Sequence, residues 1–284
     1  MRTNRWGLAL TAPSVILLTI ILIIPLIYTF YLSLYDMRYL QQGNFLLWDN
    51  YITVLTDPDV IDSFGITFLV TITALIGSLL GGLLIALWIN SRTGFIAYVI
   101  QISVLIPWVI SMVVGTLLWK WMLNPLGLVT YLLAQVGITG VDLLGNAATA
   151  PYALIFVMIW RTTGFAMVLL LAGLKSIPKE LEEAAKVDGA GVFQTFWRIR
   201  LPLLKTPLMI ASIILMLSHF NNVDVPMVLT GGGPGNATNV LVMELYRQGF
   251  EYYNFGAASA LSLILLVVNV ILIALYLRMV KYEV

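Results

Sequence analysis

The chain has 284 residues, of which 60% are hydrophobic and 10% charged, and a formal net charge of +1. These values, with a mean hydropathy of +0.96, are typical of a polytopic membrane protein, and the near-neutral charge gives no indication of nucleic-acid binding. Because the sequence has no cysteine and one histidine, His219, it excludes disulfides, thiolate metal sites and cysteine nucleophiles, and we expect no metal site and no catalytic residue.

Six apolar stretches follow one another along the chain, and each is long enough to cross a bilayer, which takes about 20 residues. The first exceeds the apolar region of a secretory signal, which is about 7–15 residues long, so we interpret it as an uncleaved span. The sequence therefore predicts an all-α, polytopic membrane protein that forms a single domain over residues 1–284. The predicted spans are residues 8–35, 64–89, 96–123, 151–174, 206–230 and 255–277.

Proline and glycine residues punctuate these spans. Pro13 and Pro25 are expected to kink the first span, and Pro107 is expected to break the third. Three small residues in the second span predict a face that packs closely against another helix. These residues are Gly77, Gly81 and Gly82.

Polar segments separate the spans. Residues 36–63 contain five aspartates and are expected to form an external loop or short helices, while residues 124–149 predict an external interfacial helix with a loop. Residues 236–254 are expected to lie outside again. Near the end of the third span, Lys120 lies between two tryptophans, a pattern typical of the membrane–water interface.

The distribution of basic residues indicates the orientation. The N-terminus, the turn at Arg92, residues 175–205 and the C-terminal tail together hold 11 of the 15 lysines and arginines. Because cytoplasmic loops carry an excess of these residues, both termini and residues 175–205 are expected on the cytoplasmic side of the plasma or inner membrane.

Residues 175–205, called the central segment from here on, contain the densest cluster of charges. Pro178 suits the first position of a helix, glutamates follow in its early turns, and Gly189 can end it in a left-handed cap. A second short helix with one apolar face is expected to end at Pro202. The apolar residues of that face are Val192, Phe193, Phe196 and Trp197.

The central segment resembles a known motif, the EAA loop of permeases from binding-protein-dependent ABC importers of the type I fold. The residues that carry the resemblance are Glu183, Ala184, Ala185, Asp188, Gly189, Ala190, Ile199, Leu201 and Pro202. The resemblance implies that these residues contact a cytoplasmic ATPase subunit and carry its motion into the membrane.

The resemblance covers nearly the whole chain and is closest to the carbohydrate-uptake branch, in particular to the first of the two permeases in maltose and glycerol-phosphate systems. Further matching residues are Pro107-Trp108, Trp160-Arg161 with Gly164-Phe165, and Leu229 to Pro234 with Thr238. The chain lacks the extra N-terminal spans and the large external domain of the longest members, so contacts made by those parts cannot be transferred.

The resemblance implies a non-enzymatic permease subunit that takes up a sugar or related polyol. It also implies the partners: a second, paralogous permease, a dimer of ATPase subunits and an extracytoplasmic solute-binding protein. The sequence contains no G-x-x-x-x-G-K-[ST] phosphate loop, so ATP and Mg²⁺ are expected on the partner ATPase and no cofactor on this chain.

Polar residues inside the predicted spans mark a candidate substrate pathway. Arg161 lies near the middle of the fourth span, where an arginine costs about 2.5–3.5 kcal/mol on insertion scales and usually faces water or the bundle interior. Asn221 and Asp224 are three residues apart in the fifth span and are expected to share a helix face. Either these three residues line a hydrated cavity that binds substrate, or Arg161 and Asp224 form an ion pair that locks two spans together.

The glycine-rich stretch after the fifth span predicts an external turn, which is a candidate external gate or loop. Its residues are Gly231, Gly232, Gly233 and Pro234.

Two other classes of protein are alternatives to a permease subunit. An ion-coupled secondary transporter would need paired helix breaks, and an intramembrane enzyme would need a nucleophile, a metal or an acid–base pair. The sequence indicates none of these features.

Overall fold

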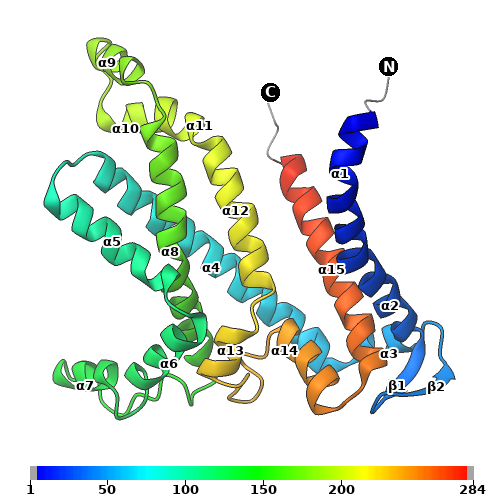
Figure 1. Ribbon diagram of the computed structural model, residues 1–284. Helices are drawn as coiled ribbons and strands as arrows, with labels where there is room; N and C mark the ends of the chain where they lie inside the picture. The colour runs from blue at the N-terminus through cyan, green and yellow to red at the C-terminus, as the bar shows by residue number, and fades with distance from the viewer. Residues whose placement is uncertain (1–4, 280–284) are drawn as a thin grey trace. The chain divides into compact units, whose positions relative to one another are not determined.

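The computed structural model describes residues 5–279, and most of them are helical (Figure 1). The outermost residues of the two predicted cytoplasmic termini, 1–4 and 280–284, lie outside this range. The chain divides into two compact units. One contains the described residues up to Ile61 together with Glu244–Ala274, and the other contains Asp62–Met243 and the described residues from Leu275 onward.

The predicted all-α class is confirmed. Within residues 5–279, four helical stretches are long and apolar enough to cross a membrane, and the number rises to as many as six if each of two bent helix pairs is counted as one span. The four are Leu10–Ser33, Pro58–Asn90, Ala150–Lys175 and Phe255–Arg278. The bent pairs are Phe95–Val109 with Met112–Met122, at 102°, and Val192–Leu203 with Lys205–Phe220, at 65°.

The unit that holds the first span begins with three helical segments. They are α1 (Arg5–Leu18), a π-helical turn η1 (Thr19–Ile23) and α2 (Ile24–Ser33). Pro13 lies inside α1, and Pro25 lies in the first turn of α2, where its missing N–H is tolerated. The first span thus accommodates both prolines and ends close to its predicted limit.

A β-hairpin follows, which the sequence did not predict for this segment. Strands β1 (Tyr35–Arg38) and β2 (Gln41–Phe45) pair antiparallel and precede α3 (Asp49–Thr56). The buried side chain of Asn50 donates hydrogen bonds to the carbonyls of Ser33 and Tyr35, at 2.8 and 2.9 Å. Asn50 therefore fixes α3 against the end of the first span.

The same unit contains the start of the last span. Helix α14 (Leu241–Tyr246) and the π turn η3 (Arg247–Glu251) lead into α15 (Phe255–Met279). Tyr253 stacks on Tyr39 of the hairpin turn, with ring centroids 5.4 Å apart. The hairpin therefore contacts the segment that starts α15.

The second unit is built around α8 (Ala150–Lys175), which packs against both α5 and α12 (Figure 1). Its helices, in chain order, are α4 (Pro58–Asn90), α5 (Phe95–Val109), α6 (Met112–Met122), α7 (Leu128–Gln135), α8, α9 (Lys179–Val187), α10 (Val192–Thr195), η2 (Phe196–Arg200), α11 (Leu201–Leu203), α12 (Lys205–Phe220) and α13 (Asp224–Leu229).

The third predicted span is broken, but not at the expected residue. Pro107 lies inside α5, and the chain becomes extended only at Ile110 and Ser111 before α6 begins. A proline removes one hydrogen bond and clashes with the preceding turn, yet neighbouring helices can absorb this strain. The prediction of a break was right, and its position was wrong by three residues.

The fifth predicted span, 206–230, is also discontinuous, which the sequence did not indicate. Helix α12 ends at Phe220, and α13 starts at Asp224. Asn221 is the C-terminal cap of α12, and its backbone angles, φ −100° and ψ 17°, are not helical. The expectation that Asn221 and Asp224 share one helix face is therefore wrong, because no continuous helix joins them.

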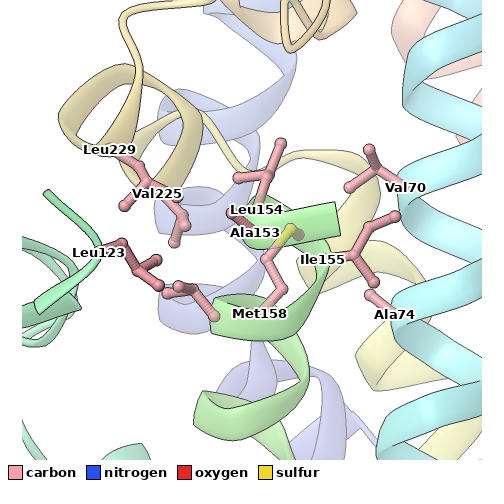
Figure 2. Packing of buried hydrophobic residues seen from close by; sticks show 10 residues of the cluster. Val70, Ala74, Leu123, Ala153, Leu154, Ile155, Met158, Val225 and Leu229 are labelled. Atoms are coloured by element: carbon pink, nitrogen blue, oxygen red, sulfur yellow. The ribbon is translucent and has the colours of Figure 1, made fainter. Parts of the chain in front are cut away.

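Two hydrophobic clusters lie along α8. The first joins the start of α8 to α4, the end of α6 and α13, and Figure 2 shows side chains of α8 between those of α4 and α13. The second joins the end of α8 to the end of α4, the start of α5 and Leu204. Between the clusters, α8 carries Arg161, Thr162 and Thr163, so a polar level separates two apolar cores.

Glycines allow α4 to approach α8 closely, as predicted. A Cβ at Gly77 would overlap the Ile159 side chain, and a Cβ at Gly82 would lie 2.6 Å from the Cβ of Ala166. Real Cβ atoms do not approach so closely, so at Gly82 the backbone of α8 would have to shift, whereas at Gly77 the end of the Ile159 side chain would have to move.

Candidate functional site

The central segment forms two short helical pieces joined at Gly189. Pro178 precedes α9 in extended geometry, so the helix begins at Lys179, one residue later than expected. Gly189 has φ +78°, which confirms the predicted left-handed cap. The second piece runs without interruption through α10, η2 and α11 to Leu203, so Pro202 lies inside its last turn instead of ending it.

An ion pair joins the two pieces. Arg200 donates two hydrogen bonds to the Glu182 carboxylate, Nε to Oε1 at 2.8 Å and the terminal nitrogen to Oε2 at 2.9 Å. Both side chains are about one-fifth exposed. The hydrogen bonds lower the pKa of the Glu182 carboxyl below its ordinary value and raise the pKa of the Arg200 guanidinium. Such a planar, two-point contact fixes orientation as well as distance.

The motif residues divide by exposure. Glu183, Ala184, Asp188, Gly189 and Pro202 are exposed, Ala190, Ile199 and Leu201 are partly buried, and Ala185 is buried. Beside them, Phe193 and Trp197 are 76% and 53% exposed, with their rings edge to face at 5.9 Å. The segment therefore presents an apolar surface next to a charged one, as protein-docking elements do. Its contact with an ATPase stays a prediction.

The base of the central segment is anchored in the second hydrophobic cluster. Ile177 and Leu204 lie near the two ends of the segment, and they are 9% and 0% exposed. Next to this anchor lies a cleft of about 450 Å³. Its charged lining residues are Lys175, Lys179, Glu182, Glu183, Lys186 and Arg200.

A hydrogen-bonded chain crosses three helices at the polar level of α8. Ser78 of α4 and Thr162 of α8 are linked through their hydroxyls at 2.7 Å, and His219 Nε2 of α12 lies 3.5 Å from the Thr162 hydroxyl. All three side chains are buried. His219 is therefore a buried packing residue with a hydrogen-bond partner.

Arg161 lies at the same level and contacts the break between α5 and α6. Its guanidinium donates to the carbonyl of Ile110 at 3.1 Å. Asp224 lies within electrostatic range of Arg161, but the ion pairs found between residues 5 and 279 do not include one between them. The structure thus brings the two residues into one region and gives Arg161 a different direct partner.

The second break, between α12 and α13, is stabilised by Asn222, which was not among the candidate residues. Its amide donates to the sulfur of Met112 at 3.3 Å, and its carbonyl oxygen accepts from the Val225 backbone N–H at 2.9 Å. Asn221 is exposed, and its amide donates to the carbonyl of Leu217. An asparagine just before a helix is a capping signal, and this signal could have revealed the break.

The glycine-rich turn is well ordered by side-chain hydrogen bonds. The Thr230 and Thr238 hydroxyls are 2.6 Å apart, and Thr238 donates to the carbonyl of Gly233 at 2.8 Å. Gly231 and Gly232 have φ of +66° and +86°, which favour glycine. Lys120 of α6, expected at a membrane interface, donates to the carbonyl of Val228 at 2.8 Å and so attaches α6 to the base of this turn.

These structural features define a class of membrane protein. Apolar helices of membrane-spanning length, two of them broken around a polar level, are combined with a charged helical element that is exposed for docking. This combination is typical of the membrane subunit of a multi-component transporter.

The comparisons assign the family. Residues 78–281 match the model described as "Binding-protein-dependent transport system inner membrane component", and the chain belongs to this family. It is 33% identical to the sulfoquinovosyl glycerol transport system permease protein SmoG of Agrobacterium fabrum, over 99% of this chain and 94% of that one. It is 32% identical to the trehalose/maltose transport system permease protein MalF of Thermococcus litoralis, over 99% and 96%.

A solved structure agrees. The fold matches a chain of a bacterial ABC transporter that imports the acidic polysaccharide alginate, with a TM-score of 0.84, 26% identity and coverage of 97% and 95% of the two chains. The predicted recognition is therefore confirmed: this is a multi-pass membrane permease subunit of an ABC transporter, and it is not an enzyme.

Proposed function

We propose that the chain is the transmembrane permease subunit of an ATP-driven importer that takes up a sugar or a related polyol. The relatives named above are permeases for a sulfosugar glycoside and for trehalose and maltose, and the structural neighbour belongs to a polysaccharide importer. The central segment carries the proposal, because it combines the EAA residue pattern with an exposed helical pair that is firmly attached to the membrane helices.

The proposed assembly contains a second, paralogous permease, two copies of an ATPase and an extracytoplasmic solute-binding protein. A relative of known structure has been described in complex with a periplasmic protein that holds an alginate pentasaccharide, which supports the last of these partners. ATP and Mg²⁺ would bind to the ATPase.

Force from the ATPase would enter at the exposed face of α9 around Glu183. The Glu182–Arg200 pair would carry it to the second helical piece. Ile177 and Leu204, both packed in the second cluster, would then pass it to α8 and α12. Rigid contacts of this kind move helices as bodies, which alternating access requires.

The substrate would pass near the polar level of α8. Arg161 lies at one helix break, and Asn221 and Asp224 lie at the other. Non-helical backbone at membrane depth is tolerated where it lines a water-filled cavity. Exposed Asn221 and the Asp224 carboxylate supply the hydrogen-bonding groups that a hydroxyl-rich solute needs. Gly231 to Pro234 would form part of the external opening.

The orientation follows from the basic residues. Both termini and the central segment would face the cytoplasm, where ATP is available, and the turn at Gly231 to Pro234 would face outward. Reporter fusions near residues 50, 140 and 240 should then report an external location, and a fusion near Ala190 an internal one. An external report at Ala190 would contradict the coupling role.

Reconstitution tests the function. The chain is co-expressed with the ATPase, second permease and binding protein of the proposed assembly, and uptake of radiolabelled trehalose, maltose and glycerol is measured in liposomes. Uptake that requires ATP and the binding protein supports the proposal. Uptake driven by an ion gradient without ATP, or failure of the ATPase to co-purify, would contradict it.

A further inference from the structure

The break between α5 and α6 creates a specific need for hydrogen-bond partners. The two helices meet at 102°, and Ile110 and Ser111 have extended backbone geometry. In a continuous helix the Ile110 carbonyl would accept from the N–H four residues later. Within a bilayer, lipid cannot supply that donor, so it must come from a side chain of a neighbouring helix or from water in a cavity.

Arg161 of α8 provides this donor, with its guanidinium 3.1 Å from the Ile110 carbonyl oxygen. It is not an isolated contact. Arg161, Gly164 and Phe165 occupy one face of α8, since they are spaced i, i+3, i+4. A Cβ at Gly164 would overlap the Val104 carbonyl oxygen, so the backbone of α5 lies directly on this face.

The third residue of the face extends the contact. Phe165 stacks on Trp108, with ring centroids 5.2 Å apart. One face of α8 thus contacts the α5 segment at three places. Gly164 lies against Val104, Phe165 stacks on Trp108, and Arg161 binds Ile110, where the chain turns. On the far side of the turn, Met112 accepts a hydrogen bond from Asn222.

We propose that Arg161 is a positioning residue that fixes the angle between α5 and α6 through the Ile110 carbonyl. It acts on transport through this break and not by touching the sugar. The inference goes beyond the proposed function, and only its uptake test rests on that function.

The first test measures the break itself and needs no substrate. Because the sequence has no cysteine, Ser111→Cys allows a spin label to be attached at this one position of the full-length chain. In the purified protein, Arg161→Met should make the label's electron paramagnetic resonance spectrum more mobile or split it into two components. Arg161→Lys, which keeps a donor, should restore much of the original spectrum.

A matched variant controls for the loss of one positive charge. Arg278 is exposed near the end of α15, and Arg278→Met should leave the label unchanged. An identical spectrum in the Arg161→Met variant would overturn the proposal. If Arg161→Met fails to insert, Arg161→Gln is measured in its place: its shorter side chain should leave the Ile110 carbonyl without the donor and make the label more mobile, and an unchanged spectrum would again overturn the proposal.

The second test uses two sugars that the reconstituted transporter takes up. Losing a charged donor to the carbonyl should lower uptake about fivefold or more for both sugars, with the two factors equal within about twofold. A residue that contacts substrate would change the ratio between the sugars instead. A changed ratio with an unchanged label spectrum would assign Arg161 to substrate contact. Absence of uptake in the unmodified transporter would count against the proposed function and leave the label test valid.

Discussion

The central segment and the polar level of α8 are both polar regions in an apolar chain, yet they are stabilised differently. In the central segment, full charges lie at the surface, and one two-point ion pair fixes two helices. At the polar level, beside the half-buried Arg161, neutral hydroxyls and one histidine are buried and link three helices. Exposed charges suit a docking element that must meet another chain, whereas buried neutral groups hold helices together at lower desolvation cost.

The largest effect is expected in the central segment. Gly189→Pro requires φ near −65° where the chain has +78°, and it removes the N–H that donates to Lys186 at 3.1 Å. Such a change costs about 3 kcal/mol or more locally, and it should abolish uptake while the protein still inserts. Co-purification of the ATPase and uptake are the measurements.

Gly191→Ala is the matched control, because Gly191 also has open space around it but a φ of −72°. Normal uptake is expected for this variant. Glu183→Lys should resemble Gly189→Pro, since Glu183 is exposed on the docking face. If Gly189→Pro and Glu183→Lys both bind the ATPase and transport normally, the central segment is not the coupling element.

A smaller effect is expected where α8 meets α5. Gly164→Ala would place a Cβ against the Val104 carbonyl oxygen and 3.1 Å from the Leu105 Cα. Overpacking of this kind costs about 1–3 kcal/mol, so the yield of folded protein and its melting temperature should fall. Gly65→Ala, in open space on α4, should leave both unchanged. Equal behaviour of the two variants would contradict the close approach of α5 and α8.

The two regions also differ in how much the sequence revealed. The charges, the glycine cap and the exposed aromatic face of the central segment were all predictable, because each depends on local chemistry at fixed spacing. The limits of its helices were less predictable, since Pro202 lies inside the last turn of the second piece, whereas a proline more often follows a helix end.

At the polar level, the residues were visible but their partners were not. Arg161 was recognised as a polar residue in a span, yet its bond to Ile110 depends on a break that occurs three residues after the proline. The break before Asp224 has local marks, Asn222 just before α13 and Pro226 in its first turn. The bond from Asn222 to Met112, like the bond from Arg161 to Ile110, joins residues of different elements, and no local pattern contains such contacts.

The polar level should show a moderate stability effect. Thr162→Val keeps the side-chain volume but removes the hydroxyl that links Ser78 and His219. Hydrogen bonds between membrane helices contribute about 0.6–1.7 kcal/mol, so the melting temperature in detergent should fall measurably. Thr19→Val is the control, since the exposed Thr19 hydroxyl bonds only within its own helix, to Val15. A loss no larger than that of the control would mean that the chain does not join these helices.

The smallest effect is expected for the ion pair of the central segment, and its pH dependence identifies it. Because Arg200 lowers the pKa of Glu182, the ionised carboxylate stabilises the folded state at pH values above the ordinary carboxyl pKa of about 4.3. This contribution is lost as the pH falls through the lowered pKa of the folded state. Glu182 raises the pKa of Arg200 from an already high value. Arg200 therefore stays charged, and the ion pair keeps its contribution to stability, throughout the alkaline range in which the protein can be handled.

The measurement is the difference in melting temperature between the original chain and Glu182→Gln. A partly exposed pair is worth about 0.2–1 kcal/mol, so the difference should be small but constant from pH 8 to pH 5 and should vanish at more acidic pH. Glu180→Gln removes an exposed carboxylate two residues earlier on the same helix and serves as the control. A Glu182→Gln difference that stayed constant into the acidic range would show that Glu182 stabilises the segment by packing, and the charge-based account of this region would then fail.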